Sequence, residues 1–154
     1  MNISQEGIDL IKRYEGLRLT CYVCAGGKKT IGYGHTGNDV YYGMKITEEE
    51  AESLLRDDLR RFEKHVESYN DCYGWTQNEF DALVSFAFNV GNIRDLTYNG
   101  IRSKKMIAEK MLNYNKAGGK KLAGLVKRRQ EEHDLFLRND NQLVRHDLQS
   151  LKGR

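Results

Sequence analysis

The chain has 154 residues, of which 39% are hydrophobic and 31% charged, and its formal net charge is +3. This length and composition describe a single soluble globular domain whose core needs neither metals nor disulfides to fold. They exclude a membrane-spanning protein, because no stretch approaches the ~20 consecutive apolar residues of a span.

The N-terminus MNISQEGIDL has no basic region followed by an apolar stretch. We therefore expect no secretory signal and synthesis in the cytoplasm. Three cysteines (Cys21, Cys24 and Cys72) are an odd, sparse set that fits a reducing compartment. Charge is uneven: residues 1–100 carry 11 basic and 16 acidic side chains, whereas residues 101–154 carry 14 and 6. A basic C-terminal third suits a partner with negative charge, either a wall polymer or nucleic acid.

The first predicted element is an amphipathic helix in SQEGIDLIKRYEG. Ile8, Ile11 and Tyr14 recur at helical spacing, Ser4 is a suitable N-cap, and Gly16 ends the helix.

From Leu17 to about Met44 the character changes to glycine, tyrosine and β-branched residues. The stretch TIGYGHTGN is typical of strand and turn, and Gly26–Gly27 is a candidate hairpin turn. This part of the sequence predicts a small β-lobe of two or three strands.

Helices follow the β-lobe. One capping box, Thr47 to Glu50, opens a long helix, and a second, Thr76 to Glu79, opens an apolar helix that ends near Gly91 and belongs in the core. A further helix is expected around 103–116, stopping at AGG, and a last one in LAGLVKRRQEEHDLFLRN. The buried face of the long helix is predicted to comprise Ala51, Leu54, Leu55, Leu59, Phe62 and Val66.

This order predicts one α+β domain. The β-lobe covers about residues 14–46, a helical lobe covers 1–13 and 47–138, and residues 139–154 form a polar tail. A cleft is expected where the two lobes meet, and such clefts bind extended substrates.

Glu15, Cys24 and Thr30 are the candidate site residues. Glycosidic cleavage needs a carboxylic acid to protonate the leaving oxygen and a second group to bring in water or attack directly. Glu15 suits the acid role, because the partial negative charge at a helix C-terminus and packing against apolar groups both disfavour the ionised carboxylate.

The stretch YEGLRLTCYVCAGGKKTIGYGHT resembles the tailed-phage lysozymes, or endolysins, of glycoside hydrolase family 24. Their signature is a glutamate, eight residues, an aspartate or cysteine, five residues, and a threonine leading into IGYGHT; Glu15, Cys24 and Thr30 meet both spacings. The resemblance continues in ALVSFAFNVG (82–91) and AGGKKLAGLVKRRQEE (117–132).

The resemblance implies a lysozyme-like fold and hydrolysis of the bond between N-acetylmuramic acid and N-acetylglucosamine in peptidoglycan. Glu15 would be the general acid, and Cys24 and Thr30 would orient water and stabilise positive charge on the sugar. No metal or cofactor is implied. The expected partner is the glycan strand, and neither nucleic acid binding nor membrane insertion is expected. The chain is expected to act as a monomer that reaches the wall after release from the cytoplasm. The sequence leaves open whether a separate pore protein is needed for that release.

Plainer interpretations remain open for each of these residues. Glu15 alone is typical of a solvated helix end, Cys24 of a small buried hydrophobe, and Thr30 of an ordinary strand position. Cys21 and Cys24 also form a Cys-x-x-Cys, the spacing of zinc or redox sites. A thiol at 24 supplies less negative charge than aspartate unless the site lowers its pKa.

Tyr33 and His35 are candidate substrate-binding residues. Core packing is the alternative for Tyr33, and a structural hydrogen-bonding role near the cleft floor is favoured for His35 over acid–base chemistry. A basic set is either a solvated face or a site for anionic wall polymers, and it comprises Lys120, Lys121, Lys127, Arg128 and Arg129. Rival functions are a nucleic-acid-binding module, a non-catalytic wall-binding protein and a lytic transglycosylase.

Overall fold

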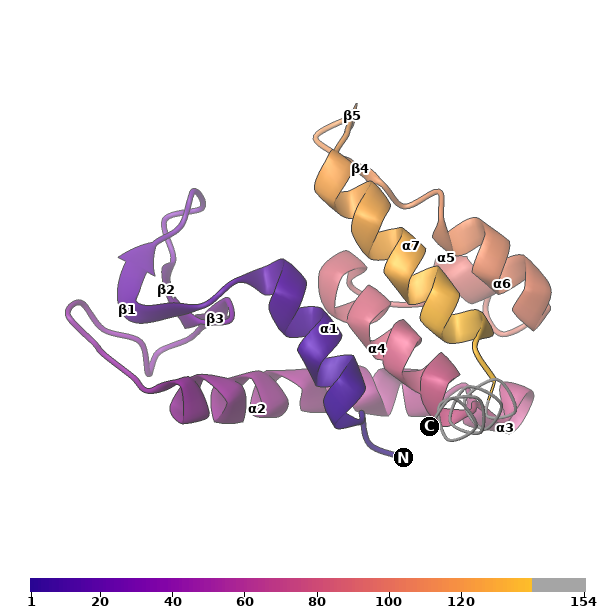
Figure 1. The fold of residues 1–154 in the computed structure, drawn as a ribbon, viewed down its shortest axis with the longest axis horizontal. Coiled ribbons are helices and arrows are strands. Elements are labelled where there is room, and N and C mark those ends of the chain that lie inside the picture. The colour runs from indigo at the N-terminus through magenta and orange to yellow at the C-terminus, as the bar shows by residue number, and fades with distance from the viewer. Residues whose placement is uncertain (140–154) are drawn as a thin grey trace, which may run out of the picture.

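A computed structural model describes residues 1–139, in which a small sheet at one end adjoins a group of helices (Figure 1). The helices are α1 (Gln5–Glu15), α2 (Glu48–Glu67), α3 (Asn70–Tyr73), α4 (Gln77–Val90), α5 (Arg94–Thr97), α6 (Lys104–Met111) and α7 (Ala123–Leu137). The strands are β1 (Arg18–Val23), β2 (Lys29–Gly32), β3 (His35–Thr36), β4 (Lys116–Ala117) and β5 (Lys120–Lys121). The architecture is α+β, as predicted.

Local capping defines where the main helices begin. Ser4 accepts a hydrogen bond from the backbone N–H of Gly7 at the start of α1. Both predicted capping boxes are present: Thr47 with Glu50 opens α2, and Thr76 with Glu79 opens α4. These caps satisfy backbone N–H groups that have no partner inside the helix, so they fix the helix starts.

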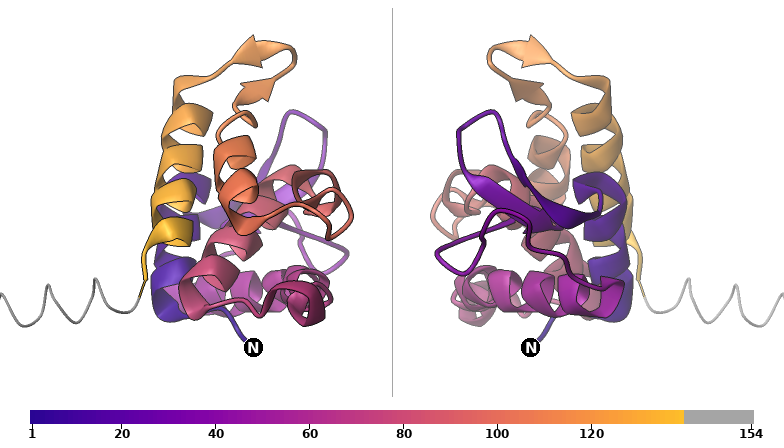
Figure 2. Two further views of the ribbon diagram at one scale, coloured as in Figure 1. Left: turned by 90° about the vertical axis from the view of Figure 1, so that its right-hand side faces the viewer. Right: turned by 90° about the vertical axis from the view of Figure 1, so that its left-hand side faces the viewer.

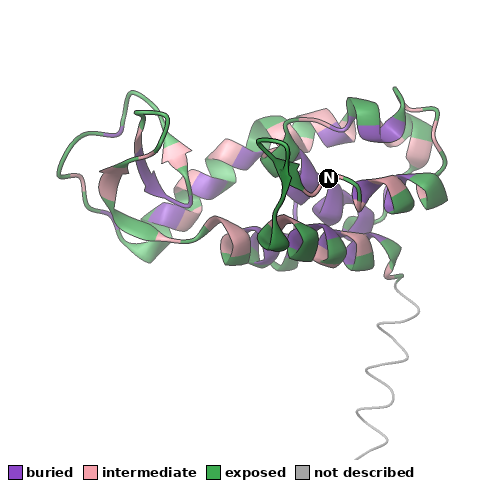
Figure 3. Cartoon of the chain, turned by 90° about the horizontal axis from the view of Figure 1, so that it is seen from above, coloured by how far each residue is buried: buried purple, intermediate pink, exposed green. Residues whose placement is uncertain are grey.

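Helix α4 is the centre of the helical lobe. It contacts α1, α2 and α7, and its residues from Asn78 to Ala87 are buried. Seen from above, buried residues concentrate on the inner helices, while the outer faces are exposed (Figure 3). Phe80, Leu83 and Phe86 are fully buried. The prediction of an all-round apolar core helix is confirmed.

The β-lobe contains a three-stranded antiparallel sheet in the order β1-β2-β3. Its first hairpin turns at the predicted Gly26–Gly27, where the N–H of Cys24 donates to the carbonyl of Lys28. Strand β2 packs on α2 and buries Ile31 completely. Helix α2 runs along the base of both lobes (Figure 1), so it holds the sheet at a fixed place beside the helices.

The region 103–116 differs from the prediction. Helix α6 ends at Met111, and the following residues form a hairpin in which β4 pairs with β5. Gly118 and Gly119 have φ values of 58° and 79°, a conformation that glycine adopts without strain, so the glycine pair is the turn of a hairpin and not only a helix stop.

The expected tail falls mostly beyond the described residues, since only Asn139 of 139–154 is among them. Between residues 1 and 139, no helix combines the length and apolarity that crossing a membrane requires.

Candidate active site

Glu15 is the last residue of α1, and the chain turns away from it at Gly16, which has φ 73°. Its side chain is 23% exposed. A cavity of about 310 Å³ opens between this end of α1 and the start of α7. Its lining consists of Tyr14, Glu15, Asn89, Leu122, Gly124, Leu125 and Arg128. The end of α1 therefore presents a carboxylate to a cavity that residues of α1, the end of α4 and the start of α7 line.

Arg128 of α7 holds this carboxylate. Its Nη1 donates to Oε1 of Glu15 at 2.8 Å, although the two residues are 113 positions apart. This ion pair differs from the apolar surroundings expected from the sequence. Oε2 has no hydrogen-bond partner among residues 1–139 and lies beside the β2–β3 turn, where a Cβ on Gly34 would be 3.8 Å away. Arg128 thus fixes one oxygen and leaves the other facing the β-lobe.

A buried polar cluster lies behind Arg128. Nε of Arg128 contacts Oε2 of Glu132 at 3.2 Å, and Nε of Arg129 contacts Oε1 of the same carboxylate at 2.7 Å. Ser85 of α4 donates its hydroxyl proton to Glu132 at 2.5 Å and accepts from Arg128 through its backbone carbonyl at 3.1 Å. The cluster anchors Arg128 from the side opposite Glu15.

This cluster corrects the prediction of one basic face. Arg128 and Arg129 are 3% and 0% exposed, so neither belongs to a solvated face or to a surface for anionic polymers. Burial is possible because Glu15, Glu132 and Ser85 supply their partners. Lys120, Lys121 and Lys127 are exposed.

Cys24 and Thr30 meet at the base of the β1–β2 hairpin. Thr30 is 3% exposed and donates to the carbonyl of Lys28 at 3.0 Å. Hydrogen bonds from the backbone of Lys28, then from the backbone of Gly26 and the side chain of Thr30, lower the pKa of the Cys24 thiol. The site therefore raises the thiolate fraction at Cys24, which offsets part of the negative charge that an aspartate at this position would supply.

The three candidate residues do not lie together in one part of the molecule. Cys24 and Thr30 contact each other on the β-lobe, whereas Glu15 is held from the helical lobe by Arg128. Within the described part of the chain, no hydrogen bond or ion pair joins Glu15 to Cys24 or Thr30. Neither Cys24 nor Thr30 lines the cavity at Glu15.

Tyr33 lies in the core of the β-lobe. Its side chain is 8% exposed, and the ammonium group of Lys12 is 5.6 Å from the centre of its ring. This burial leaves little ring surface for a sugar, and substrate binding by Tyr33 stays a prediction.

His35 is held between two carboxylates. Nδ1 lies 2.9 Å from Asp58 of α2, and Nε2 lies 2.9 Å from Asp39 of the loop that follows β3. Burial lowers the pKa of His35, but the hydrogen bonds to Asp58 and Asp39 outweigh it, so the net change is upward. His35 therefore fastens the sheet to α2, the role favoured from the sequence.

This arrangement predicts pH-dependent stability. Because the folded pKa of His35 is raised, its contribution is complete below the unfolded value of about 6.5 and is lost as pH rises through the folded pKa. Burial lowers the pKa of His65, so protonation of His65 reduces stability only below about pH 6.5. The effects of His35 and His65 therefore fall in different pH ranges. We expect the free energy of unfolding, measured by urea titration, to fall above about pH 6.5.

The same titration on His35→Asn should show a flatter dependence above that pH. His133→Asn is the matched control, because His133 lies on α7 and contacts only its neighbour Asp134 among the partners found in residues 1–139. Equal slopes for His35→Asn and the unmodified chain would contradict the assignment.

The Cys-x-x-Cys spacing of Cys21 and Cys24 is one that metal sites use. In residues 1–139, no three His, Cys, Asp or Glu side chains are grouped closely enough to hold a metal ion. Cys21, Cys24 and Cys72 are all free thiols, and Cys21 packs against the hydrophobic core.

Sequence reasoning missed the residues that support the site, namely Arg128 with Glu132, and Asp58. A usable signal existed for the first pair: Arg128 and Glu132 are four residues apart, the spacing of a helical ion pair. Asp58 gave no such signal, because it meets His35 only when α2 packs under the sheet.

Comparison with known proteins identifies a family and several relatives that this chain resembles. Residues 12–132 match the family model described as phage lysozyme. The endolysin of Bacillus phage B103 is 46% identical over 151 residues, covering 94% of this chain. The chain spans 57% of the length of that endolysin and 55% of the length of the endolysin of Bacillus phage PZA.

Two solved structures are similar along their whole length. The muramidase domain of SpmX from Asticaccaulis excentricus is 39% identical with a TM-score of 0.75, and the match covers 90% of this chain and 99% of that one. A mutant of P22 lysozyme is 37% identical with a TM-score of 0.77, and the coverage is again 90% and 99%. The predicted lysozyme-like fold is confirmed.

Proposed function

Because this chain belongs to the phage lysozyme family, we propose that it is a muramidase that hydrolyses the β-1,4 bond between N-acetylmuramic acid and N-acetylglucosamine in peptidoglycan. The observation that carries the proposal is Glu15 at the mouth of the cavity beside α7, held by Arg128, with a thiol and a hydroxyl on the β-lobe. Relatives named endolysin or muramidase support the same activity.

In this proposal Glu15 donates a proton to the glycosidic oxygen. Arg128 occupies Oε1, so the proton is delivered from Oε2, the oxygen that faces the β2–β3 turn. In this scheme the bound glycan excludes water from Glu15 before cleavage. The bond to the leaving oxygen breaks as that oxygen takes the proton, and Glu15 is left as a carboxylate paired with Arg128.

Positive charge then develops on the sugar ring. Cys24 in its thiolate form supplies compensating negative charge, and Thr30 positions the water that attacks the ring carbon. As the new C–O bond forms, this water releases a proton to solvent, from which Glu15 takes up the proton that it gave to the leaving oxygen. The chain acts in this scheme as a monomer on a glycan strand, with no cofactor and no nucleic acid. Cytoplasmic synthesis followed by release to the wall stays a prediction.

The test of this function is mass spectrometry of purified peptidoglycan after digestion. Hydrolysis gives fragments with muramic acid at the reducing end. Anhydro-sugar ends would indicate a transglycosylase, and intact peptidoglycan would indicate a wall-binding protein. Tight, salt-sensitive DNA binding without cleavage of the wall would favour the nucleic-acid alternative.

Cys24 gives a separate prediction. Cys24→Ala should lose about 10²-fold in kcat, the typical cost of removing one group that stabilises charge in the transition state. Cys24→Asp should retain most activity, because a carboxylate supplies the same negative charge. Turnover of soluble peptidoglycan measures both, with Cys21→Ala as the control. Activity of Cys24→Ala near that of the unmodified chain would show that the thiol only packs.

A further inference from the structure

Two hairpin turns beside the candidate active site carry exposed or half-buried lysines. We call these lysines the basic tips. They are Lys28 and Lys29 at the β1–β2 turn, and Lys116, Lys120 and Lys121 on the β4–β5 hairpin. Over residues 1–139, no carboxylate forms an ion pair with any of the five.

The β4–β5 hairpin places like charges together. Lys116 and Lys121 are directly opposite each other across the two strands, and Lys120 is opposite Ala117. Like charges at opposed strand positions destabilise a pair of strands, and this hairpin is exposed along its length. An anionic partner would remove the repulsion, so the hairpin is suited to bind one.

The hairpin also adjoins the cavity of Glu15. Leu122 follows Lys121 directly and lines that cavity together with Gly124. The N–H of Leu122 donates to the carbonyl of Asn115 at 3.0 Å and closes the base of the hairpin, so the lysines are held at the cavity's edge and not on a loose loop.

The β1–β2 turn lies on the other side of the cavity. Both hairpins extend to the same side of the molecule, one from each lobe, with the end of α1 between them (Figures 1 and 2). Lys28 is exposed, and the ammonium group of Lys29 lies 4.4 Å from the centre of the Tyr42 ring. A glycan strand that approaches Glu15 from this side therefore passes between the ammonium groups of the two hairpins.

We propose that the basic tips bind the free carboxylates of the peptide stems attached to the glycan strand. The inference rests on the proposed function and specifies its substrate. Stems are carried by the muramic acid units themselves, so their carboxylates accompany every bond that is cut, whereas phosphodiester wall polymers are attached to few sugars. Ammonium groups on flexible stems suit anions whose position varies from one stem to the next.

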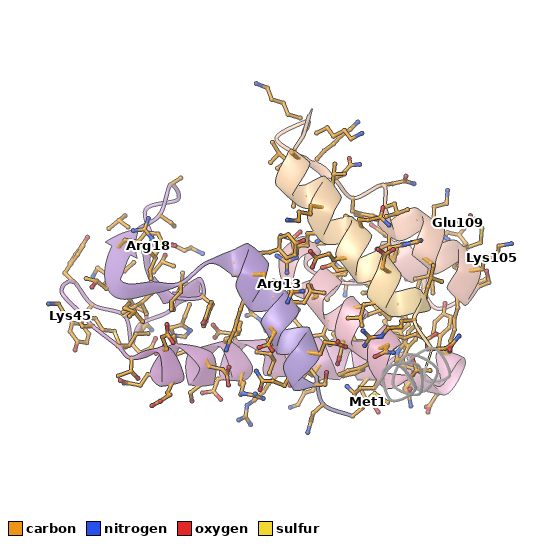
Figure 4. All side chains as sticks on the ribbon, viewed as in Figure 1. Met1, Arg13, Arg18, Lys45, Lys105 and Glu109 are labelled. Carbon is orange, nitrogen blue, oxygen red and sulfur yellow. The ribbon has the colours of Figure 1, made fainter. Side chains whose placement is uncertain are left out.

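The test is the double variant Lys120→Gln with Lys121→Gln. Exposed ion pairs contribute little each, so we expect KM to rise about three- to ten-fold on stem-bearing peptidoglycan, with kcat unchanged and a weaker dependence on salt. The matched control is Lys64→Gln with Lys105→Gln, which removes the same charge at exposed sites; Lys105 lies on α6, away from both hairpins (Figure 4).

Two forms of the substrate test whether the stem carboxylates are the groups that the lysines bind. The assay uses peptidoglycan stripped of phosphodiester polymers, and the same material with its stem carboxylates converted to amides. The KM ratio of variant to unmodified chain should fall to about one on the amidated substrate, because the lysines then have no anion to bind.

Three results would overturn the inference: an unchanged KM on the stem-bearing substrate, an equal rise on the amidated substrate, or a rise seen only on walls that retain phosphodiester polymers. An unmodified chain that cleaves neither substrate overturns the proposed function as well. If the unmodified chain cleaves peptidoglycan but the KM ratio does not change as expected, only the inference about the basic tips is contradicted, and the proposed function is not.

Discussion

Glu15→Gln is expected to lose about 10²–10⁴-fold in kcat on peptidoglycan, the range typical of removing a general acid. Glutamine keeps the shape of the side chain and an oxygen that accepts from Arg128, but it has no acidic proton to give. The fold should survive, since Arg128 remains paired with Glu132 and Ser85. Release of soluble fragments measures the loss, and circular dichroism checks the fold.

A second substrate separates proton donation from a general defect. Glycosides with a phenol leaving group of low pKa need little protonation, so the difference between Glu15→Gln and the unmodified chain should shrink on them. Glu6→Gln is the control, because Glu6 is also an α1 carboxylate paired with an arginine, Arg138, but lies outside the cavity of Glu15. A folded Glu15→Gln protein with near-full activity on peptidoglycan would remove Glu15 from the acid role.

The helix starts could be predicted from sequence because each depends on residues three apart. Ser4, Thr47 and Thr76 all cap the helices they were expected to cap. The apolar helix α4 was equally predictable, since its burial follows from composition alone. These features are local, and no knowledge of the remaining chain is needed to find them.

The β4–β5 hairpin was not predictable in the same way. A glycine pair after a helical pattern is compatible with a helix stop and with a hairpin turn. Two strands of two residues each carry no alternating pattern that favours the second outcome.

The environment of Glu15 was the main failure of sequence reasoning. Helix position and nearby apolar residues predicted a desolvated acid, yet Arg128 comes from 113 residues away to pair with it. The burial of Arg128 in turn depends on Ser85, 43 residues before it. A charged residue is read as exposed unless its partners are known, and here the partners come from α1, α4 and α7, which only the folded chain brings together.

Glu132 should have the largest effect on stability. It is fully buried between Arg128 and Arg129 and accepts from Ser85. Glu132→Gln leaves two buried guanidinium groups without this anion, and breaking a buried pair in this way costs about 3–5 kcal/mol of unfolding free energy. Urea denaturation at pH 7 measures the change.

Glu131 is the matched control for this prediction, because it is the neighbouring glutamate on the same helix and forms a partly exposed pair with Arg13 at 3.0 Å. Glu131→Gln should cost at most about 1 kcal/mol, as surface pairs do. Adding Arg129→Gln to Glu132→Gln should recover part of the loss, because one unpaired cation is then removed, and the double-mutant cycle gives the coupling. Similar small costs at 131 and 132 would mean that water reaches the cluster, and that Glu132 does not hold Arg128 in place beside Glu15.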